Sequence, residues 1–440
     1  MDLPSGFITQ MRGLLHEDAD DFLAAMMREP VTSVRLNRRK PGAAFPEAEP
    51  VRWCRCGFYL HQRPVFTLDP LLHAGAYYVQ DASSMIYHET ICRIADILSH
   101  DIDSDTTPPL ALLDVCAAPG GKTTAMIDAL PDGSRVVANE YVAKRAAILR
   151  ENLAKWGYPD AIVTNCDSSR FAGGDAFDIV AVDAPCSGEG MMRKEKAAIE
   201  QWSPQLIEEC SSLQKEILEN AVKAVAPGGF LIYSTCTFNR RENEENAEFI
   251  RSQLGMIPVD MGFPEEWGIP RGIDTDIPAY RFMPHKTEGE GLFLSVFRKP
   301  GEWEPKSLRS VSSSHDKGAE VADRKQNPKR AIQRDKGRHA NDREKKRKEP
   351  ETVPEIQEIL SLNFDRSRYP EADLTKEDAI AYLRRESITL PPDVPKGLVT
   401  VTYRGLPLGM VKNIGNRANN LYPKNWRILM QADAAPQPTK

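Results

Sequence analysis

The chain has 440 residues with 57 Lys and Arg against 63 Asp and Glu, so its formal net charge is -6. At about 100–200 residues per domain this length predicts two to four domains, and a hydrophobic content of 41% excludes a chain that is disordered throughout. No stretch approaches the roughly 20 apolar residues of a membrane span, and 8 cysteines are too few for a disulfide scaffold.

Residues 1–105 are predicted to form an N-terminal extension that mixes helix and strand. Its first residues are acidic where a secretory signal has a basic end and an apolar run, so we expect a cytoplasmic protein. The segment 14–27 has the apolar spacing of an amphipathic helix. The segments 31–37 and 58–68 are predicted to be short strands broken by proline.

Residues 106–300 alternate between strand and helix patterns. This alternation predicts an α/β fold with a doubly wound, mainly parallel sheet. The expected strands lie at 111–116, 135–140, 161–165, 178–184, 230–235 and 292–298. The expected helices include 122–130, a helix ending near Trp156, an amphipathic helix over 204–226 and a helix over 241–254.

Residues 301–350 hold 15 Lys and Arg against 9 Asp and Glu and have few apolar side chains. Such a segment cannot bury enough surface to offset chain entropy, so we predict a disordered basic linker there. Residues 351–440 then form a small β-rich domain with a hairpin around Arg404 and Gly405. Its last part interleaves cations with aromatic residues, which is typical of a polar domain surface or of an RNA-contacting module.

The loop after the first predicted strand of 106–300 is the first candidate ligand site. Gly121-Lys122-Thr123 nearly matches a phosphate-binding P-loop, but Cys116 stands where that motif has its first glycine. A GxGxxG motif is also missing, because the only glycines of the loop are adjacent. These departures disfavour a nucleoside triphosphate and a dinucleotide.

The remaining ligand of this fold class is S-adenosylmethionine, bound over the carboxyl ends of the strands. Its ribose hydroxyls need a carboxylate at the end of the second strand, where Glu140 stands. Its adenine amino group needs an acceptor after the third strand, where Asp167 stands. The ordered set of loop, Glu140 and Asp167 therefore favours this cofactor over chance loop acids.

Two cysteines follow the next two strands, in Asp183-Ala-Pro-Cys-Ser-Gly and in Ser234-Thr-Cys-Thr. A single free cysteine is usually a buried apolar residue, but two at neighbouring strand ends favour a chemical role. Carbon 5 of a pyrimidine accepts a methyl group from a sulfonium only after a thiolate has added to carbon 6. Asp183 is placed to assist that addition at the edge of the ring.

Together, Asp114-Val-Cys-Ala-Ala-Pro-Gly-Gly-Lys-Thr and the two cysteine motifs resemble the Nol/Nop/Sun family of RNA cytosine-5 methyltransferases. The segment 73–84 is similar to the family's segment leading into the catalytic domain, and the resemblance covers roughly residues 1–300. The segments Gly397-Leu-Val-Thr-Val and Leu421-Tyr-Pro-Lys-Asn-Trp-Arg resemble the C-terminal, PUA-like domain of the bacterial RsmF-type members, which methylate small-subunit ribosomal RNA.

This resemblance implies a Rossmann-like catalytic domain that forms 5-methylcytosine with S-adenosylmethionine. It implies that Cys236 is the nucleophile and that Cys186 assists product release, a ranking of the two thiols that the residues alone leave open. Asp183 is implied at the target and at the cofactor. The implied cofactor-binding positions are Cys116, Ala117, Ala118, Pro119, Gly120, Gly121, Lys122, Glu140, Asp167 and Asp183.

We expect small-subunit ribosomal RNA as the partner, free or within the subunit, and a monomeric enzyme. Transfer RNA is the alternative substrate, and a non-catalytic ribosome-assembly factor is the alternative function. The two thiols and the full cofactor set favour an enzyme. We expect no metal site, because the Cys54 and Cys56 pair lacks further ligands. Arg193-Lys194 and Arg240-Arg241 are either phosphate contacts or solvated cations.

Overall fold

The computed structural model describes residues 2–102, 106–305 and 353–430. The predicted basic linker of residues 301–350 therefore lies almost wholly outside the described residues. Among the residues that are described, no helix is long and apolar enough to cross a membrane.

The N-terminal part contains two short helices and a small antiparallel sheet. Helices α1 (Ser5–Leu15) and α2 (Ala19–Met26) are separated by a tight turn at His16–Asp18, so the single helix predicted over 14–27 is wrong in its start and its continuity. The turn lets Phe7 of α1 and Phe22 of α2 bury against one apolar cluster, which one straight helix would not do.

The small sheet has the order β2-β3-β1-β4, with strands Glu49–Pro50, Gly57–Leu60, Thr32–Leu36 and Tyr77–Val79. The strand predicted over 31–37 is confirmed as β1. The strand predicted over 58–68 is only half right: β3 ends at Leu60, and a helical turn follows at Phe66–Leu68. Pro64 lies between them and cannot donate a ladder hydrogen bond.

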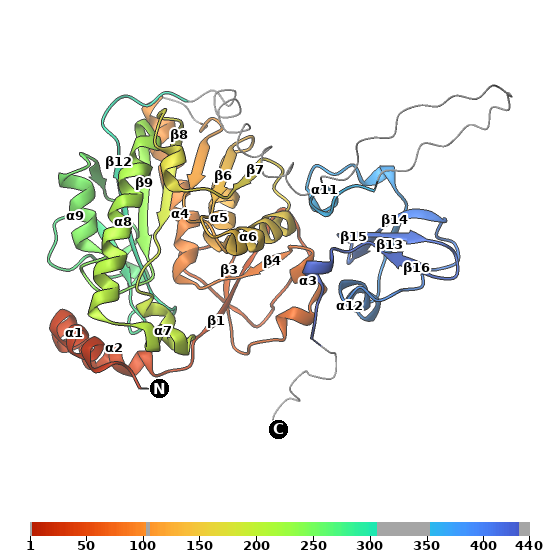
Figure 1. Cartoon of the computed structure of the whole chain (residues 1–440), viewed down its shortest axis with the longest axis horizontal. Coiled ribbons are helices and arrows are strands. Elements are labelled where there is room, and N and C mark those ends of the chain that lie inside the picture. Colours follow the sequence, from red (N-terminus) through yellow and green to blue (C-terminus); the bar gives the residue numbers. More distant parts are fainter. Residues whose placement is uncertain (1, 103–105, 306–352, 431–440) are drawn as a thin grey trace, which may run out of the picture.

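The central sheet confirms the predicted doubly wound α/β fold (Figure 1). Its order is β10-β12-β9-β8-β5-β6-β7. The five parallel strands are β5 (Ala111–Asp114), β6 (Arg135–Asn139), β7 (Ala161–Thr164), β8 (Phe177–Asp183) and β9 (Val225–Thr235). β12 (Leu292–Arg298) pairs antiparallel with β9, and β10 (Ile257–Val259) and β11 (Ala279–Phe282), which were not predicted, pair with β12.

Successive residues of a strand point to opposite faces of the sheet. Both faces of this sheet carry buried apolar side chains, and helices cover both of them. Leu112 of β5 faces one core, together with side chains of α4 (Ile86–Asp101), α5 (Gly121–Ala129) and α6 (Ala143–Trp156). Leu113 faces the other core, with α8 (Pro204–Ala224) and α9 (Glu244–Ser252). Both layers leave one edge of the sheet, at the carboxyl ends of the parallel strands, to the loops.

The C-terminal domain is β-rich, as predicted. Its sheet has the order β13-β14-β15-β16, with strands Glu371–Asp373, Gly397–Tyr403, Leu406–Asn413 and Ala418–Asn420. The predicted hairpin is confirmed, since Arg404 and Gly405 join β14 to β15, both with positive φ. Helices α11 (Ile356–Leu360) and α12 (Lys376–Leu383) complete the domain.

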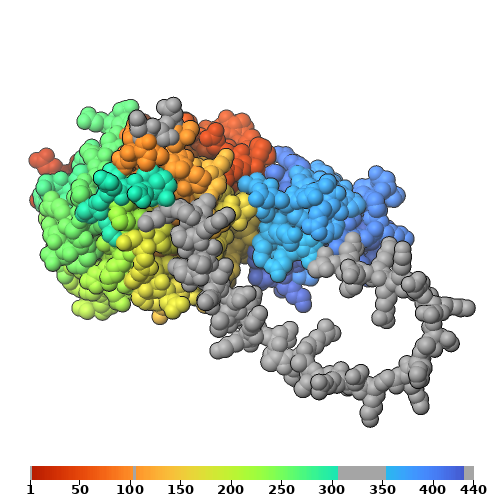
Figure 2. Space-filling model, turned by 90° about the horizontal axis from the view of Figure 1, so that it is seen from above, coloured from red at the N-terminus to blue at the C-terminus, as the bar shows by residue number. Residues whose placement is uncertain are grey.

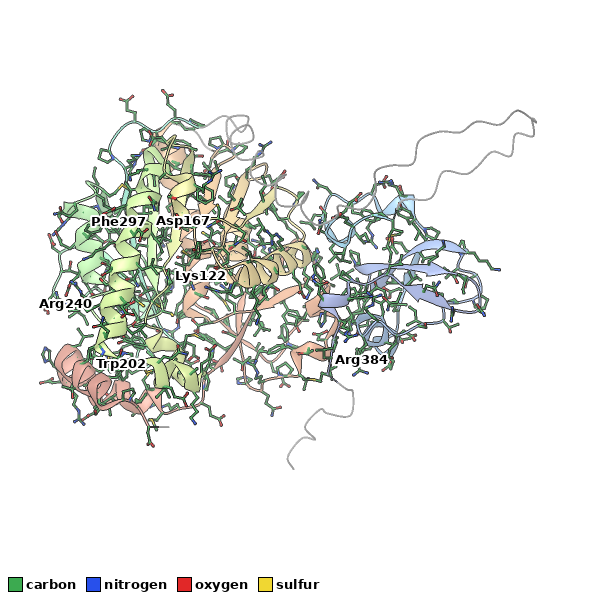
Figure 3. The ribbon with its side chains drawn as sticks, in the orientation of Figure 1. Lys122, Asp167, Trp202, Arg240, Phe297 and Arg384 are labelled. Atoms are coloured by element: carbon green, nitrogen blue, oxygen red, sulfur yellow. The ribbon has the colours of Figure 1, made fainter. Side chains whose placement is uncertain are left out.

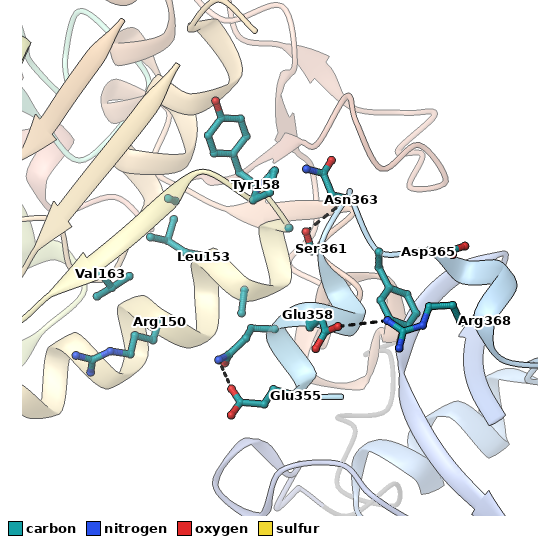
Figure 4. A pocket seen from close by; sticks show the side chains of 16 residues that line it. Arg150, Leu153, Tyr158, Val163, Glu355, Glu358, Ser361, Asn363, Asp365 and Arg368 are labelled. Carbon is teal, nitrogen blue, oxygen red and sulfur yellow. Dashed lines mark hydrogen bonds and ion pairs between the residues drawn. The ribbon is translucent and has the colours of Figure 1, made fainter. Parts of the chain in front are cut away.

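The C-terminal domain packs against the rest of the chain (Figure 2). Its apolar core is continuous with residues of the N-terminal part. The buried Lys40 ammonium donates to the carbonyl oxygens of Ala74, Lys155 and Leu360, at 3.2, 2.7 and 2.8 Å. A cleft of about 710 Å³ lies between α6 and α11 (Figure 4), and none of the predicted site residues lines it.

Candidate active site

The predicted site residues lie on loops at the carboxyl ends of five neighbouring strands. The loop after β5 holds 116–122, Glu140 follows β6, and Asp167 follows β7. Asp183 ends β8, and Cys236 directly follows β9. Lys122, in the loop after β5, and Asp167, after β7, are labelled in Figure 3. Residues that are up to 120 positions apart in the chain therefore share one rim.

The two cysteine loops touch each other. The sulfur atoms of Cys186 and Cys236 are 3.3 Å apart. The backbone N–H of Gly190 donates to the Cys236 carbonyl at 2.9 Å, and a Cβ added at Gly190 would lie only 2.7 Å from that oxygen. The hydrogen bond with Cys236 and burial raise the pKa of the Cys186 thiol well above its ordinary value. Cys186 is therefore held as a thiol at neutral pH.

A hydrogen-bonded chain runs through Asp183 beside the thiols. The Lys122 ammonium lies 2.9 Å from one carboxylate oxygen of Asp183, and the Ser234 hydroxyl donates to the other at 2.7 Å. The hydroxyl of the fully buried Tyr87 lies 2.7 Å from that of Ser234. Burial lowers the pKa of Lys122, but the Asp183 carboxylate outweighs it and the net shift is upward. Lys122 thus carries a fixed positive charge at the rim.

Glu242 connects the loop of Cys186 to the loop of Cys236 by hydrogen bonds. Its buried carboxylate accepts from the backbone N–H of Ser187 at 3.0 Å, from Gln214 at 2.7 Å and from the Asn239 amide at 2.8 Å. Burial raises the pKa of Glu242, and these donors oppose the shift. No sequence pattern indicated this role, because Glu242 stands in a run of polar residues that is typical of an exposed helix start.

Glu140 and Asp167, after β6 and β7, have mostly nearby partners in the chain. Glu140 accepts from the backbone N–H of Val142 at 2.8 Å and lies 3.4 Å from the Arg145 guanidinium, which also donates to the Ala118 carbonyl at 2.8 Å. Asp167 is exposed and accepts from the backbone N–H of Ser169 at 3.0 Å. The hydrogen bonds with Ser169 lower the pKa of Asp167.

Exposed apolar side chains stand beside these acceptors. Tyr141 is 71% exposed and Val142 is 47% exposed, directly after Glu140. An adenine nucleoside offers hydroxyl and amino donors and an apolar ring face, so the acceptors Glu140 and Asp167 together with the exposed Tyr141 ring fit such a group. Sequence reasoning missed Tyr141, although its place after the strand-end acid could have indicated it.

The two basic pairs that were candidates for phosphate contacts are bound to carboxylates and carbonyls of the chain itself. Arg193 is buried and donates to the Gly289 carbonyl, and Lys194 lies 3.3 Å from Glu290. The Arg240 and Arg241 guanidinium groups form ion pairs, with Asp274 in the first case and with Glu208 and Glu245 in the second. These pairs favour a structural role over phosphate contacts. The described residues contain no cluster of three metal-ligating side chains.

Three family models match the chain in sequence order. The N-terminal domain of 16S rRNA methyltransferase RsmF matches residues 3–82, and 16S rRNA methyltransferase RsmB/F matches residues 103–298. The RsmF PUA domain matches residues 369–428.

Curated relatives carry the name ribosomal RNA small subunit methyltransferase F. The protein of Pectobacterium atrosepticum is 33% identical over 322 residues, which are 69% of this chain and 64% of that protein. The protein of Klebsiella pneumoniae is 28% identical over 478 residues, which are 96% of each chain. The chain thus aligns with somewhat less than two thirds of the first relative and with nearly all of the second.

Two solved structures from Pyrococcus horikoshii share the fold. NSun6 with SFG is 19% identical, with a TM-score of 0.54 over 67% of this chain and 98% of that chain. A methyltransferase homologue is 25% identical, with a TM-score of 0.55 over 67% of this chain and 95% of that chain.

Proposed function

The chain belongs to the RsmB/F family of 16S rRNA methyltransferases, and we propose that it forms 5-methylcytosine in small-subunit ribosomal RNA through a covalent cysteine adduct. The observation that carries this proposal is the pair of thiols, 3.3 Å apart, beside the Lys122–Asp183 ion pair at the carboxyl edge of the sheet. A thiol pair at this place suits addition to, and release from, a pyrimidine ring.

In the proposed reaction the Cys236 thiolate adds to carbon 6 of the cytosine, which makes carbon 5 nucleophilic. Asp183 faces the ring edge and supports the addition by hydrogen bonding, while Lys122 and Ser234 keep its carboxylate in place. S-adenosylmethionine, when bound, supplies an electrophilic methyl group. A base then takes the proton from carbon 5, the electron pair of that bond restores the double bond between carbons 5 and 6, and the bond from carbon 6 to sulfur breaks so that Cys236 leaves as a thiolate.

Cys186 is suited to the release step. Its proton is held firmly, because contact with Cys236 and burial raise the pKa of its thiol. At 3.3 Å from the Cys236 sulfur, the S–H group can donate to the leaving thiolate and stabilise it. The addition step needs no proton from Cys186. Cys236 therefore acts in the addition step and Cys186 in the release step.

We propose that the loop 116–122 holds the cofactor, with Glu140 on the ribose, Asp167 on the adenine and Lys122 and Asp183 toward the methyl donor. The fit of the acceptors and of the exposed Tyr141 to a nucleoside supports this placement. We also propose that the enzyme acts as a monomer. An rRNA substrate and the C-terminal domain as RNA contact imply action in the cytoplasm.

The test is transfer of labelled methyl groups to separate pools of small-subunit rRNA and transfer RNA, followed by bisulfite mapping of the labelled pool. Label at a cytosine of the rRNA supports the proposal. Label in the transfer RNA alone would identify transfer RNA, instead of rRNA, as the substrate. No label in either pool would favour a non-catalytic assembly factor.

A further inference from the structure

Glu189 is a fully buried carboxylate between the two cysteine loops. One of its oxygens accepts from the Thr237 hydroxyl at 2.6 Å and from the backbone N–H groups of Phe238 and Asn239 at 2.7 and 2.9 Å. These three residues directly follow Cys236 in the chain. A single carboxylate oxygen therefore fixes the backbone of the loop that carries the proposed nucleophile.

The other oxygen of Glu189 connects this loop to the N-terminal helices. It accepts from the amide of Gln10, on α1, at 2.8 Å and from the indole N–H of Trp202 at 3.1 Å. The ring of Phe238 also packs edge-on against Phe22 of α2, with ring centroids 4.9 Å apart. The helices α1 and α2, which lie beside α7 (Lys196–Gln201) in Figure 1, thus reach the loop by two routes.

The opposite side of the loop is held as well. The buried Arg281 guanidinium donates to the Phe238 carbonyl at 2.7 Å, and the Asn243 amide donates to the Thr237 carbonyl at 2.9 Å. Arg281 itself is paired with the buried Glu244. The loop therefore cannot shift without breaking several buried hydrogen bonds, and Glu189 makes the largest share of those to its N–H groups.

The hydrogen bonds of Glu189 make its hold on the Cys236 loop sensitive to small changes of the Glu189 side chain. Its five donors in the described structure are uncharged groups, so each one matters for satisfying a buried carboxylate. An amide in its place presents an NH₂ group either to the loop or to Trp202. Both orientations set one N–H donor against another, which weakens the hold on the loop.

We propose that Glu189 is a positioning residue that places Cys236 for attack and through which helix α1 acts on the active site. This inference rests on the proposed function, because it takes Cys236 as the nucleophile. Attack on carbon 6 requires the sulfur within a narrow range of distance and direction, and a misplacement of about 1 Å slows such a step by roughly 10²-fold.

The test compares Glu189→Gln with Glu195→Gln, the same change at an exposed position six residues further along. Both are made in a Cys186→Ala background, in which the RNA adduct is expected to accumulate. We expect Glu189→Gln to form the adduct roughly 10²-fold more slowly than the control, with the dissociation constant for S-adenosylmethionine unchanged. Gln10→Ala and Trp202→Phe leave the loop side of Glu189 intact and are expected to slow the adduct less, in the same direction.

A second measurement needs neither RNA nor cofactor. Alkylation of Cys236 by iodoacetamide, followed by peptide mass spectrometry, is expected to become faster in Glu189→Gln, because a looser loop exposes the sulfur. Equal adduct and alkylation rates in the two Glu→Gln variants overturn the positioning role, and unchanged rates in Gln10→Ala overturn the part of α1. If no variant forms an adduct but alkylation still differs, the proposed reaction fails while the anchoring of Cys236 stands.

Discussion

The two halves of the strand edge are held in different ways. In the half formed by β8 and β9 there are two fully buried carboxylates: Glu189, which follows Cys186, accepts from the loop of Cys236, and Glu242 accepts from both cysteine loops. In the half formed by β6 and β7, Glu140 and Asp167 each accept from the backbone N–H two residues further on. The carboxylates of the thiol half therefore bind distant segments, whereas Glu140 and Asp167, in the half that we propose holds the cofactor, accept mainly from local groups.

This difference follows from what each half has to do under the proposed reaction. A nucleophile must be in place before its target arrives, because its placement sets the rate of bond formation. An acceptor for a ligand hydroxyl or amino group gains its partner only when the ligand binds. We therefore expect substitutions in the thiol half to change the chemical step and substitutions in the cofactor half to change binding.

The largest effect is expected for Cys236→Ala. Loss of the nucleophile removes the covalent route, so turnover should fall by at least about 10⁴-fold and no RNA adduct should form. Denaturing gels of protein and rRNA incubated with cofactor measure the adduct. Cys210→Ala, a half-buried cysteine on α8, is the matched control and should behave like the unchanged protein. An adduct in Cys236→Ala would contradict the assignment.

Cys186→Ala is expected to separate addition from release. The adduct should form and then persist, because the leaving thiolate has lost the S–H group 3.3 Å away. On a denaturing gel the complex appears as a slow band that survives heating in denaturant. Should Cys186→Ala lose the adduct while Cys236→Ala accumulates it, the two roles are exchanged.

How far the sequence leads also differs between the two halves. Parallel strands bring their carboxyl ends to one edge, so the positions of Cys186, Cys236 and Glu140 on that edge follow from strand order alone. The anchoring network does not follow in this way. Gln10 and Glu189 are 179 positions apart, and only the packing of α1 against α7 and α8 brings them into contact.

Local irregularities were also beyond the sequence patterns. The strands β10 and β11 are short and antiparallel and lie beside β12, so they lack the long apolar runs that mark buried parallel strands. The break between α1 and α2 depends on a turn whose benefit is burial against Trp202 and Met283. Periodicity predicts which face of an element is buried, but not where its partner requires it to bend.

Asp183 is the one residue that we propose acts on both the target base and the cofactor, and Asp183→Asn tests which role dominates. It removes the charge that holds Lys122 and keeps a side chain of the same shape, so we expect a fall in kcat of roughly 10²-fold. Burial would then lower the pKa of Lys122 against only the weaker attraction of other groups such as Asp81, and the variant should lose activity further as the pH rises. Ser234→Ala, which leaves the ion pair intact, should have a smaller effect. A change in KM for the cofactor alone would assign Asp183 to binding.

The smallest effects are expected in the cofactor half, and they differ between its two acids. Glu140→Gln should weaken S-adenosylmethionine binding by roughly 10-fold or more, since under the proposed placement the buried carboxylate accepts a charge-assisted hydrogen bond from a ribose hydroxyl. Asp167→Asn should weaken it only a few-fold, because an exposed acceptor exchanges a ligand for water at little cost. Calorimetric titration measures both, with Asp160→Asn, an exposed acid just before β7, as the control. If either change slowed adduct formation at saturating cofactor, the separation between a binding half and a reacting half would not hold.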